Sequence, residues 1–244
     1  MGMSPPFEHR VLETTDRYEV VRDGAGIVGK ALLRGTVRGG RAAMDQYLRF
    51  PVETVADLRE LKKRYDPSEV ARYPADWSES ISGWAERDHV LVLGRNCCAG
   101  FYGVARAWMG AENLCLALHD DPALCAEMFE FIADFVIELT TPIVTEVDFD
   151  YFNFFEDMAS STGPLMSPRS FRELVFPHHR RAIDHLKSHG VRYVSLDSDG
   201  ATGRSSRSSW RWASMSTGRS SAPPTWTPSA SRNSTALISA SGPE

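Results

Sequence analysis

Two acidic segments, each directly after a short apolar run, carry the side chains that could do chemistry. Glu156-Asp157 follows the run Asp150–Phe155, and Asp197-Ser198-Asp199-Gly200 follows the run Val191–Leu196. If the two runs are neighbouring parallel strands, four carboxylates meet at the carboxyl edge of one sheet, where α/β folds place their active sites. Crowded carboxylates raise one another's pKa, so one of them could stay protonated and act as a general acid.

Other roles for these acids remain open. A pair such as Asp197 and Asp199 could hold a hard metal ion through oxygen ligands. Alternatively, each acid only caps the helix after its strand, because aspartate is a favoured N-cap residue. Since both acidic segments follow uninterrupted apolar runs, we favour a joint site over four separate caps.

The remaining reactive residue types give weaker signals. Cys97-Cys98 could include a nucleophile, but the sequence places no base beside the pair, which favours buried thiols. The run His178-His179-Arg180-Arg181 could bind an anion at a helix start, although a solvated helix face is the commoner explanation. Five aromatic residues favour core packing over a platform for a flat ligand: Phe149, Tyr151, Phe152, Phe154 and Phe155.

The first elements expected along the chain are a hairpin and a helix. Tyr18–Asp23 and Ile27–Leu33 are rich in β-formers and flank Gly24-Ala25-Gly26, which predicts a β-hairpin. Thr54 and Asp57 resemble a capping box, with Asp where Glu or Gln is usual, and so predict a helix start.

Downstream, predicted strands and helices alternate. Buried strands are expected at His89–Leu93 and at the two apolar runs above. Pro142 is expected to kink or end the first helix between them. This order predicts an α/β domain with parallel strands, and both open doubly wound sheets and closed barrels satisfy it. No glycine-rich nucleotide fingerprint follows a strand. Helix starts are expected at Asp121-Pro122, Ser167-Pro168 and Pro177.

Composition narrows the class of protein. The 244 residues carry a net charge of −5, which gives no support to nucleic-acid binding. No run of eighteen apolar residues is present, so we expect no membrane partner. The first ten residues lack the apolar core of a secretory signal, and the four cysteines show no CxxC spacing. Both features favour a reducing cytoplasm.

The last 44 residues differ in composition from the rest of the chain. Residues 201–244 hold 13 serines and five arginines against one acid, giving a charge of +4, whereas residues 1–200 carry −9. The segment has no sustained hydrophobic periodicity, so it cannot bury enough apolar surface to offset its ordering entropy. We therefore predict two parts: an α/β domain over residues 1–200 and a disordered tail over residues 201–244.

Several motifs between residues 154 and 200 resemble those of a known family. The stretch from Phe154 to Gly200 is similar to the uroporphyrinogen decarboxylase superfamily, which includes porphyrin-pathway decarboxylases and corrinoid-dependent methyltransferases. Two upstream segments, RYDPSEVARYP and WMGAENLCLALHDDPALC, extend the resemblance to residues 7–200. The matching pieces are Glu156-Asp157-Met158, Gly163-Pro164-Leu165-Met166-Ser167-Pro168, Phe171-Arg172, Pro177, Lys187-x-x-Gly190 and Asp197-Ser198-Asp199-Gly200.

The resemblance implies a TIM-like (β/α)₈ barrel, here partial and incomplete at both ends, with its site at the carboxyl mouth. Glu156 and Asp157 would be catalytic, and Asp197, Asp199 and Gly200 would bind the substrate, a small molecule or a tetrapyrrole. The family implies corrinoid-dependent methyl transfer, with a corrinoid (cobalamin) cofactor and a corrinoid protein as partner. Uroporphyrinogen decarboxylation in porphyrin biosynthesis is the alternative, and a truncated fragment without catalysis is a third.

Departures from the family pattern sharpen these expectations. Zinc-binding methyltransferases of the family carry His-x-Cys-Gly where this chain has Asp197-Ser198-Asp199-Gly200, which argues against a zinc thiolate site and suits a hard cation or no metal better. The decarboxylases carry an arginine-rich N-terminal segment with an early catalytic aspartate, and this chain is expected to begin after it. That difference favours methyl transfer.

The tail is interpreted as translated out of frame. The reading frame is shifted so that each new codon begins at the third base of an old one. The codons of Trp212-Ala213 (TGG-GCN) then contain GGC, which encodes glycine, and those of Trp226-Thr227 (TGG-ACN) contain GAC, which encodes aspartate. Permitted codons then allow Gly-Val-Asp, Pro-Leu-Glu, Met-Asp and Tyr-Gly, in the order typical of the family. A barrel that lacks its later strands exposes a sheet edge and apolar helix faces. We therefore expect a marginally stable, aggregation-prone and inactive chain.

Overall fold

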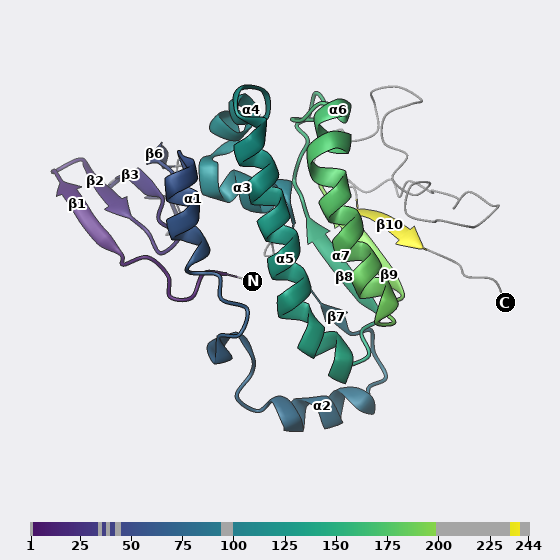
Figure 1. Cartoon of the computed structure of the whole chain (residues 1–244). Helices are drawn as coiled ribbons and strands as arrows, with labels where there is room; N and C mark the ends of the chain where they lie inside the picture. The colour runs from purple at the N-terminus through teal and green to yellow at the C-terminus, as the bar shows by residue number, and fades with distance from the viewer. Residues whose placement is uncertain are drawn as a thin grey trace.

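A small antiparallel sheet begins the fold. The computed structural model describes residues 2–33, 36–37, 40–41, 45–93, 100–198 and 235–239. The sheet has the order β1-β2-β3-β6, and a separate ribbon pairs β4 with β5 (Figure 1). The predicted hairpin is confirmed as β2 and β3. The bounds are β1 (Arg10–Thr14), β2 (Tyr18–Arg22), β3 (Val28–Leu32), β4 (Thr36–Val37), β5 (Gly40–Arg41) and β6 (Gln46–Arg49).

Helix α1 (Val55–Lys62) begins with the predicted capping box. The backbone N–H of Asp57 donates to Thr54 Oγ1 at 3.2 Å, and the backbone N–H of Thr54 donates to Asp57 Oδ2 at 2.9 Å. The shorter Asp side chain therefore serves where Glu is usual. The bond from the Thr54 hydroxyl is the main cause that lowers the pKa of Asp57. Leu58 and Leu61, three residues apart, are buried on the inner face.

The second sheet carries the site. Its order is β10-β9-β8-β7. Strands β7, β8 and β9 are parallel, as predicted, and β10 runs antiparallel to β9. Strand β7 is shorter than the expected His89–Leu93. The bounds are β7 (Val92–Leu93), β8 (Tyr151–Phe155), β9 (Tyr193–Asp197) and β10 (Thr235–Ser239).

Two of the three expected helix starts have the expected caps. Asp121 accepts from the Leu124 N–H at 3.1 Å, and Ser167 accepts from the Ser170 N–H at 3.0 Å. Helix α7 begins at Phe176, one residue before the expected Pro177, and continues the preceding π-helical turns without a side-chain cap. Helix α5 does not end at Pro142, because its buried stripe continues past the proline to Val144. The bounds are η1 (Val70–Arg72), α2 (Trp77–Ala85), α3 (Tyr102–Met109), α4 (Ala111–Asp120), α5 (Pro122–Glu146), α6 (Pro168–Ser170), the π-turn η2 (Phe171–Val175) and α7 (Phe176–Ser188).

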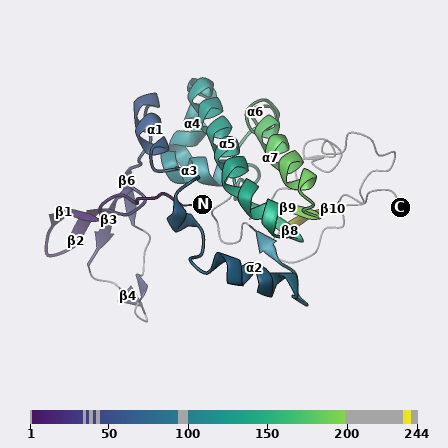
Figure 2. The same ribbon diagram turned by 60° about the horizontal axis from the view of Figure 1, so that its bottom comes forward.

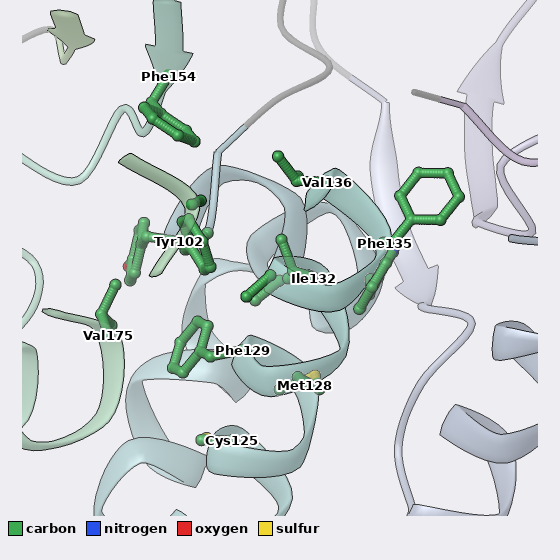
Figure 3. Packing of buried hydrophobic residues seen from close by; sticks show 14 of the residues in the cluster. Tyr102, Cys125, Met128, Phe129, Ile132, Phe135, Val136, Phe154 and Val175 are labelled. Carbon is green, nitrogen blue, oxygen red and sulfur yellow. The ribbon is translucent and has the colours of Figure 1, made fainter. Parts of the chain in front are cut away.

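One hydrophobic core joins the helices to the second sheet. Helices α5 and α7 pack on the same face of β8 and β9 (Figures 1 and 2). Alternate residues of β8 enter the core, so Phe152 and Phe154 are buried beneath the helices. Helix α5 contributes the longest buried stripe, part of which Figure 3 shows: Cys125, Met128, Phe129, Ile132, Phe135 and Val136.

The architecture is mixed α/β, and the described residues form no closed barrel. Three parallel strands with helices on one face agree with part of the predicted (β/α)₈ arrangement. Apart from β10, residues 199–244 lie outside the described residues, so the two-part division of the chain and the disorder of residues 201–244 stay predictions.

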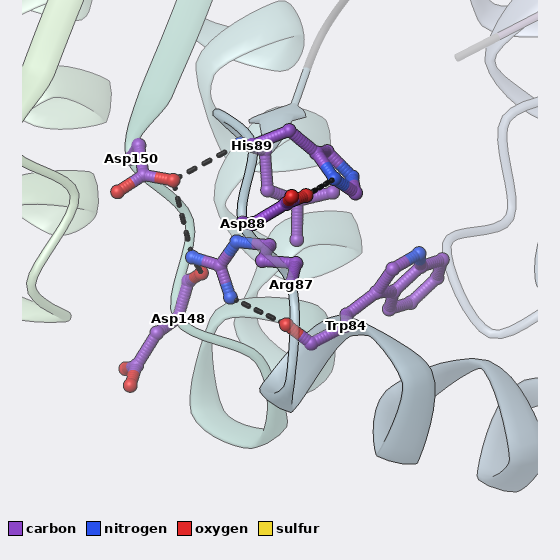
Figure 4. A network of polar contacts seen from close by, with 7 residues as sticks. Trp84, Arg87, Asp88, His89, Asp148 and Asp150 are labelled. Carbon is purple, nitrogen blue, oxygen red and sulfur yellow. Dashed lines mark hydrogen bonds and ion pairs between the residues drawn. The ribbon is translucent and has the colours of Figure 1, made fainter.

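Ionic contacts fix the amino edge of the second sheet, opposite the acidic segments (Figure 4). The Arg87 guanidinium donates to the Asp148 carbonyl at 2.6 Å and to the Asp150 carboxylate at 3.1 Å. Asp150 also accepts from the Leu91 N–H at 3.0 Å, which is the main cause that lowers its pKa. These contacts join the segment before β7 to the start of β8, so they stabilise the fold without entering the site.

Helix α3 begins unusually close to the end of β8. A Cβ atom at Gly100 would overlap the carbonyl oxygen of Phe155, and one at Gly103 would lie 2.5 Å from the same oxygen. Only glycine permits this approach, which brings the helix N-terminus onto the carboxyl edge of the sheet.

We expect Gly100→Ala to lower the free energy of unfolding by about 2 kcal/mol, because the methyl group must push α3 away from β8. Gly83 on α2 is the matched control, since a Cβ there meets nothing within 4 Å. Gly83→Ala should raise stability by up to about 1 kcal/mol. Urea unfolding measures both, and equal effects of the two changes would contradict the close approach.

Candidate functional site

The two acidic segments meet at the carboxyl edge of the second sheet. Strands β8 and β9 are parallel neighbours, with Phe155 opposite Asp197. The backbone N–H groups of Glu156 and Asp157 both donate to the Asp197 carbonyl, at 2.8 and 3.2 Å. The structure therefore brings together Glu156, Asp157 and Asp197. Asp199 and Gly200 lie outside the described residues.

The Glu156 carboxylate is fully buried at the N-terminus of α3. It accepts from the backbone N–H of Phe101 at 2.8 Å and from that of Tyr102 at 2.6 Å. His179 Nε2 lies 2.7 Å from Oε1 of the same carboxylate. The first N–H groups of a helix have no partner within it and carry a partial positive charge, so they stabilise this anion. The placement makes Glu156 a structural link between β8, α3 and α7.

His179 belongs to this site, a role that the sequence did not predict. A solvated face does not describe it, because its side chain is 1% exposed and its ring centroid lies 4.4 Å from that of Phe101. The anion beside it is the Glu156 carboxylate of the chain itself. The solvated-face interpretation was wrong at His179, since this residue falls on the apolar stripe of the helix. That stripe was readable from the spacing of Val175, His179, Ala182 and Leu186, all buried. Arg180 and Arg181 are exposed, as a solvated face requires.

Asp157 lies just after β8 at the carboxyl edge of the sheet, which we call the mouth, and its backbone conformation is strained. Its φ angle is 43°, in the left-handed region that non-glycine residues rarely adopt. The Arg106 guanidinium contacts its Oδ2 at 2.7 Å and its carbonyl at 3.3 Å. The two side chains are 30% and 23% exposed, for Arg106 and Asp157 respectively, so solvent reaches the pair. Such strain persists where the surroundings hold it, and it is frequent at functional sites.

The face of the sheet opposite the helices carries aromatic and polar residues. The register places Tyr151, Asn153 and Phe155 of β8 beside Tyr193, Ser195 and Asp197 of β9. We call these six residues the inner face. The aromatic residues are thus divided: Phe149, Phe152 and Phe154 are core, as predicted, whereas Tyr151 and Phe155 are only half-buried.

Within the described residues, no group of three or more His, Cys, Asp or Glu side chains could hold a metal ion. The suggested Asp197–Asp199 metal pair stays a prediction, because Asp199 lies outside the described part. A cavity of about 10 Å³ lies between α3 and α5 and is lined mainly by apolar groups such as Val104 and Ile132. Its volume suits a water molecule at most.

Two of the four cysteines, Cys115 and Cys125, lie in the described residues, and both are free thiols. Burial raises the pKa of the Cys125 thiol to about 12. Cys115 is half-buried, and its Sγ lies 3.6 Å from the Tyr102 hydroxyl. Cys97-Cys98 lies outside the described residues.

No helix in the described ranges has the length and apolar character needed to cross a membrane.

Comparison with known proteins gives one match. The family model described as uroporphyrinogen decarboxylase (URO-D) matches residues 47–201, more than half of the chain. This range runs from β6 to the end of the second acidic segment. No curated protein and no solved structure matches.

We expect Glu156→Gln to lower the free energy of unfolding by about 3 kcal/mol, because it leaves buried N–H donors and His179 without their anion. Asp157→Asn is the matched control and should cost at most about 1 kcal/mol, since its ion pair is partly solvated. Urea unfolding of both variants measures the difference. Equal midpoints would show that the buried carboxylate does not hold the fold together.

Two histidines of α7 predict a pH dependence of stability. Burial is the main cause that lowers the pKa of His178 and of His185 below 6.5. The unfolded chain therefore binds more protons, and stability should fall as the pH drops below about 6.5. Replacing both histidines with glutamine should flatten this fall in thermal unfolding. His119→Gln, on an exposed part of α4, should leave the slope unchanged. A slope that survives the double change would contradict this account.

Proposed function

Because the chain belongs to the uroporphyrinogen decarboxylase family, we propose that the edge formed by β8 and β9 serves corrinoid-dependent methyl transfer. The family includes methyl transfer and decarboxylation, and the matched range spans both acidic segments. The charge of the inner face favours the first reaction over the second.

The character of the inner face is the observation that carries this proposal. Strands β7, β8 and β9 place no Lys or Arg on it, and its one charged residue is Asp197. Uroporphyrinogen is a polycarboxylate, and carboxylates are recognised by cationic donors. A face of aromatic and polar residues with no Lys or Arg from these three strands suits an uncharged or cationic methyl donor better.

We assign the acids different roles within this reaction. Asp157 is partly exposed at the carboxyl edge and its carboxylate is paired with Arg106, so it is the better candidate to stabilise positive charge on the heteroatom that carries the methyl group. Asp197 is half-buried on the inner face and is the candidate for binding the methyl donor. The burial of Glu156 supports a positioning role, because its carboxylate already binds α3 and His179.

We assign the corrinoid to a partner protein that docks at the carboxyl edge of β8 and β9. In this proposal the chain itself binds the methyl donor.

Decarboxylation of uroporphyrinogen is the second candidate, and Arg106 is the observation in its favour. Its guanidinium lies at the mouth, where a substrate carboxylate could bind. In the structure, however, Asp157 neutralises this cation at 2.7 Å.

Assays of the chain with cob(I)alamin plus a methyl donor, and with uroporphyrinogen, separate the candidates. We expect methyl transfer from a methylated ether or ammonium compound to cob(I)alamin, with methylcobalamin and the demethylated compound as products. Asp157→Asn should lower this activity about 100-fold, because it removes a charge that stabilises the transition state. Asp184→Asn, at an exposed ion pair of α7, is the matched control and should keep the activity. Carbon dioxide release from uroporphyrinogen without methyl transfer would favour the second candidate. Absence of both activities would reject this proposal and agree with the inactive fragment that the out-of-frame tail predicts.

A further inference from the structure

A hydrogen-bonded chain crosses the inner face between β8 and β9. Ser195 Oγ donates to Asn153 Oδ1 at 2.5 Å, and the two residues are partners in the strand register. The Tyr151 hydroxyl contacts the same Ser195 Oγ. Ser195 is fully buried, whereas Tyr151 and Asn153 are half-buried. Three side chains of two strands are therefore fixed relative to one another.

The chemistry of a hydroxyl group gives this chain one direction. A serine hydroxyl has a single hydrogen, and here that hydrogen goes to Asn153. The Tyr151 hydroxyl must then donate to Ser195 Oγ, since serine has no second hydrogen to give. The order is Tyr151 to Ser195 to Asn153, and it ends on the amide oxygen. The amide of Asn153 is thereby held with Oδ1 toward β9.

The fixed amide leaves a donor on the inner face. No hydrogen bond joins Asn153 Nδ2 to another of the described residues. Asn153 is half-buried and its Nδ2 is not one of the fully buried polar atoms, so water or a ligand can accept from it. Asp197 lies two register positions along the same face, roughly 6–7 Å away along the strand.

From this geometry we infer that Asn153 is a specificity-determining residue that donates a hydrogen bond from Nδ2 to an uncharged acceptor oxygen of the substrate. The substrate class is a methyl donor that carries a neutral carbonyl or ether oxygen. A carboxylate is a poorer match, because carboxylates are bound most strongly by cationic donors and the amide of Asn153 is neutral. The inference rests on the proposed function for the location of the site, and Ser195 is a positioning residue that acts through Asn153.

The first test observes the amide directly in the full chain and needs no activity. The side-chain NH₂ signals of Asn153 are assigned by ¹H–¹⁵N NMR as those lost in Asn153→Asp. N,N-dimethylacetamide, a neutral probe that only accepts hydrogen bonds, should shift these signals. Ethylammonium, which only donates, should leave them in place. Signals that ignore dimethylacetamide, or that respond equally to both probes, would overturn the inference.

Variants separate recognition from structure. Asn153→Asp replaces the donor with an acceptor of the same shape and should weaken dimethylacetamide binding about tenfold, as observed on the remaining inner-face signals. Asn113→Asp, an amide on α4 remote from the inner face, is the matched control and should bind normally. Ser195→Ala frees the amide to rotate and should give a smaller loss than Asn153→Asp. Normal binding by Asn153→Asp would refute the role of Nδ2.

The same variants address the proposed function without depending on it. In the methyl-transfer assay, Asn153→Asp should raise KM for donors with a carbonyl or ether oxygen by about tenfold and leave kcat nearly constant. An NMR response without any methyl transfer would reject the proposed reaction and keep the recognition site. Methyl transfer with an unchanged KM in Asn153→Asp would keep the reaction and reject the recognition site.

Discussion

The carboxylate of Glu156 lies where three elements converge: the end of β8, the start of α3 and the inner side of α7. It is completely buried, and a buried anion is tolerable only where donors surround it. Backbone N–H groups of Phe101 and Tyr102 and the ring of His179 supply those donors. Because the carboxylate must reach the helix N-terminus, α3 has to approach β8 closely, which is why glycine stands at position 100.

The rest of the carboxyl edge depends on this arrangement. With α3 in place, Arg106 on its second turn reaches the side chain and the carbonyl of Asp157 and holds that residue at positive φ. The backbone of Asp157 also donates to the Asp197 carbonyl, so the ends of β8 and β9 stay in register. One buried anion thus orients the partly exposed acid that faces the mouth, although the buried group itself has no access to a substrate.

The strands have two chemically distinct faces, and this separates stability from function. Phe152 and Phe154 point into the core beneath α5 and α7. Alternate residues, Asn153 and Ser195 among them, form the inner face, where the Tyr151–Ser195–Asn153 chain fixes the amide. At the opposite edge, the Arg87–Asp150 contacts only fasten the strand starts. A change in the core should therefore affect unfolding, and a change on the inner face should affect recognition.

Local signals in the sequence were enough to predict the helix caps at Thr54, Asp121 and Ser167 and the parallel strands β8 and β9. Capping chemistry and apolar runs can be read in this way because they involve only a few neighbouring residues. They also placed Glu156, Asp157 and Asp197 at one edge. Only the tertiary structure decided which of these three carboxylates is buried and structural and which remains exposed to solvent. Burial, the donors of α3 and the partner His179 come from segments 23 to 55 residues away from Glu156, and no local pattern encodes such contacts. The sequence determined which residues meet, and the packing of α3 and α7 on β8 determined which carboxylate is structural and which stays open to solvent.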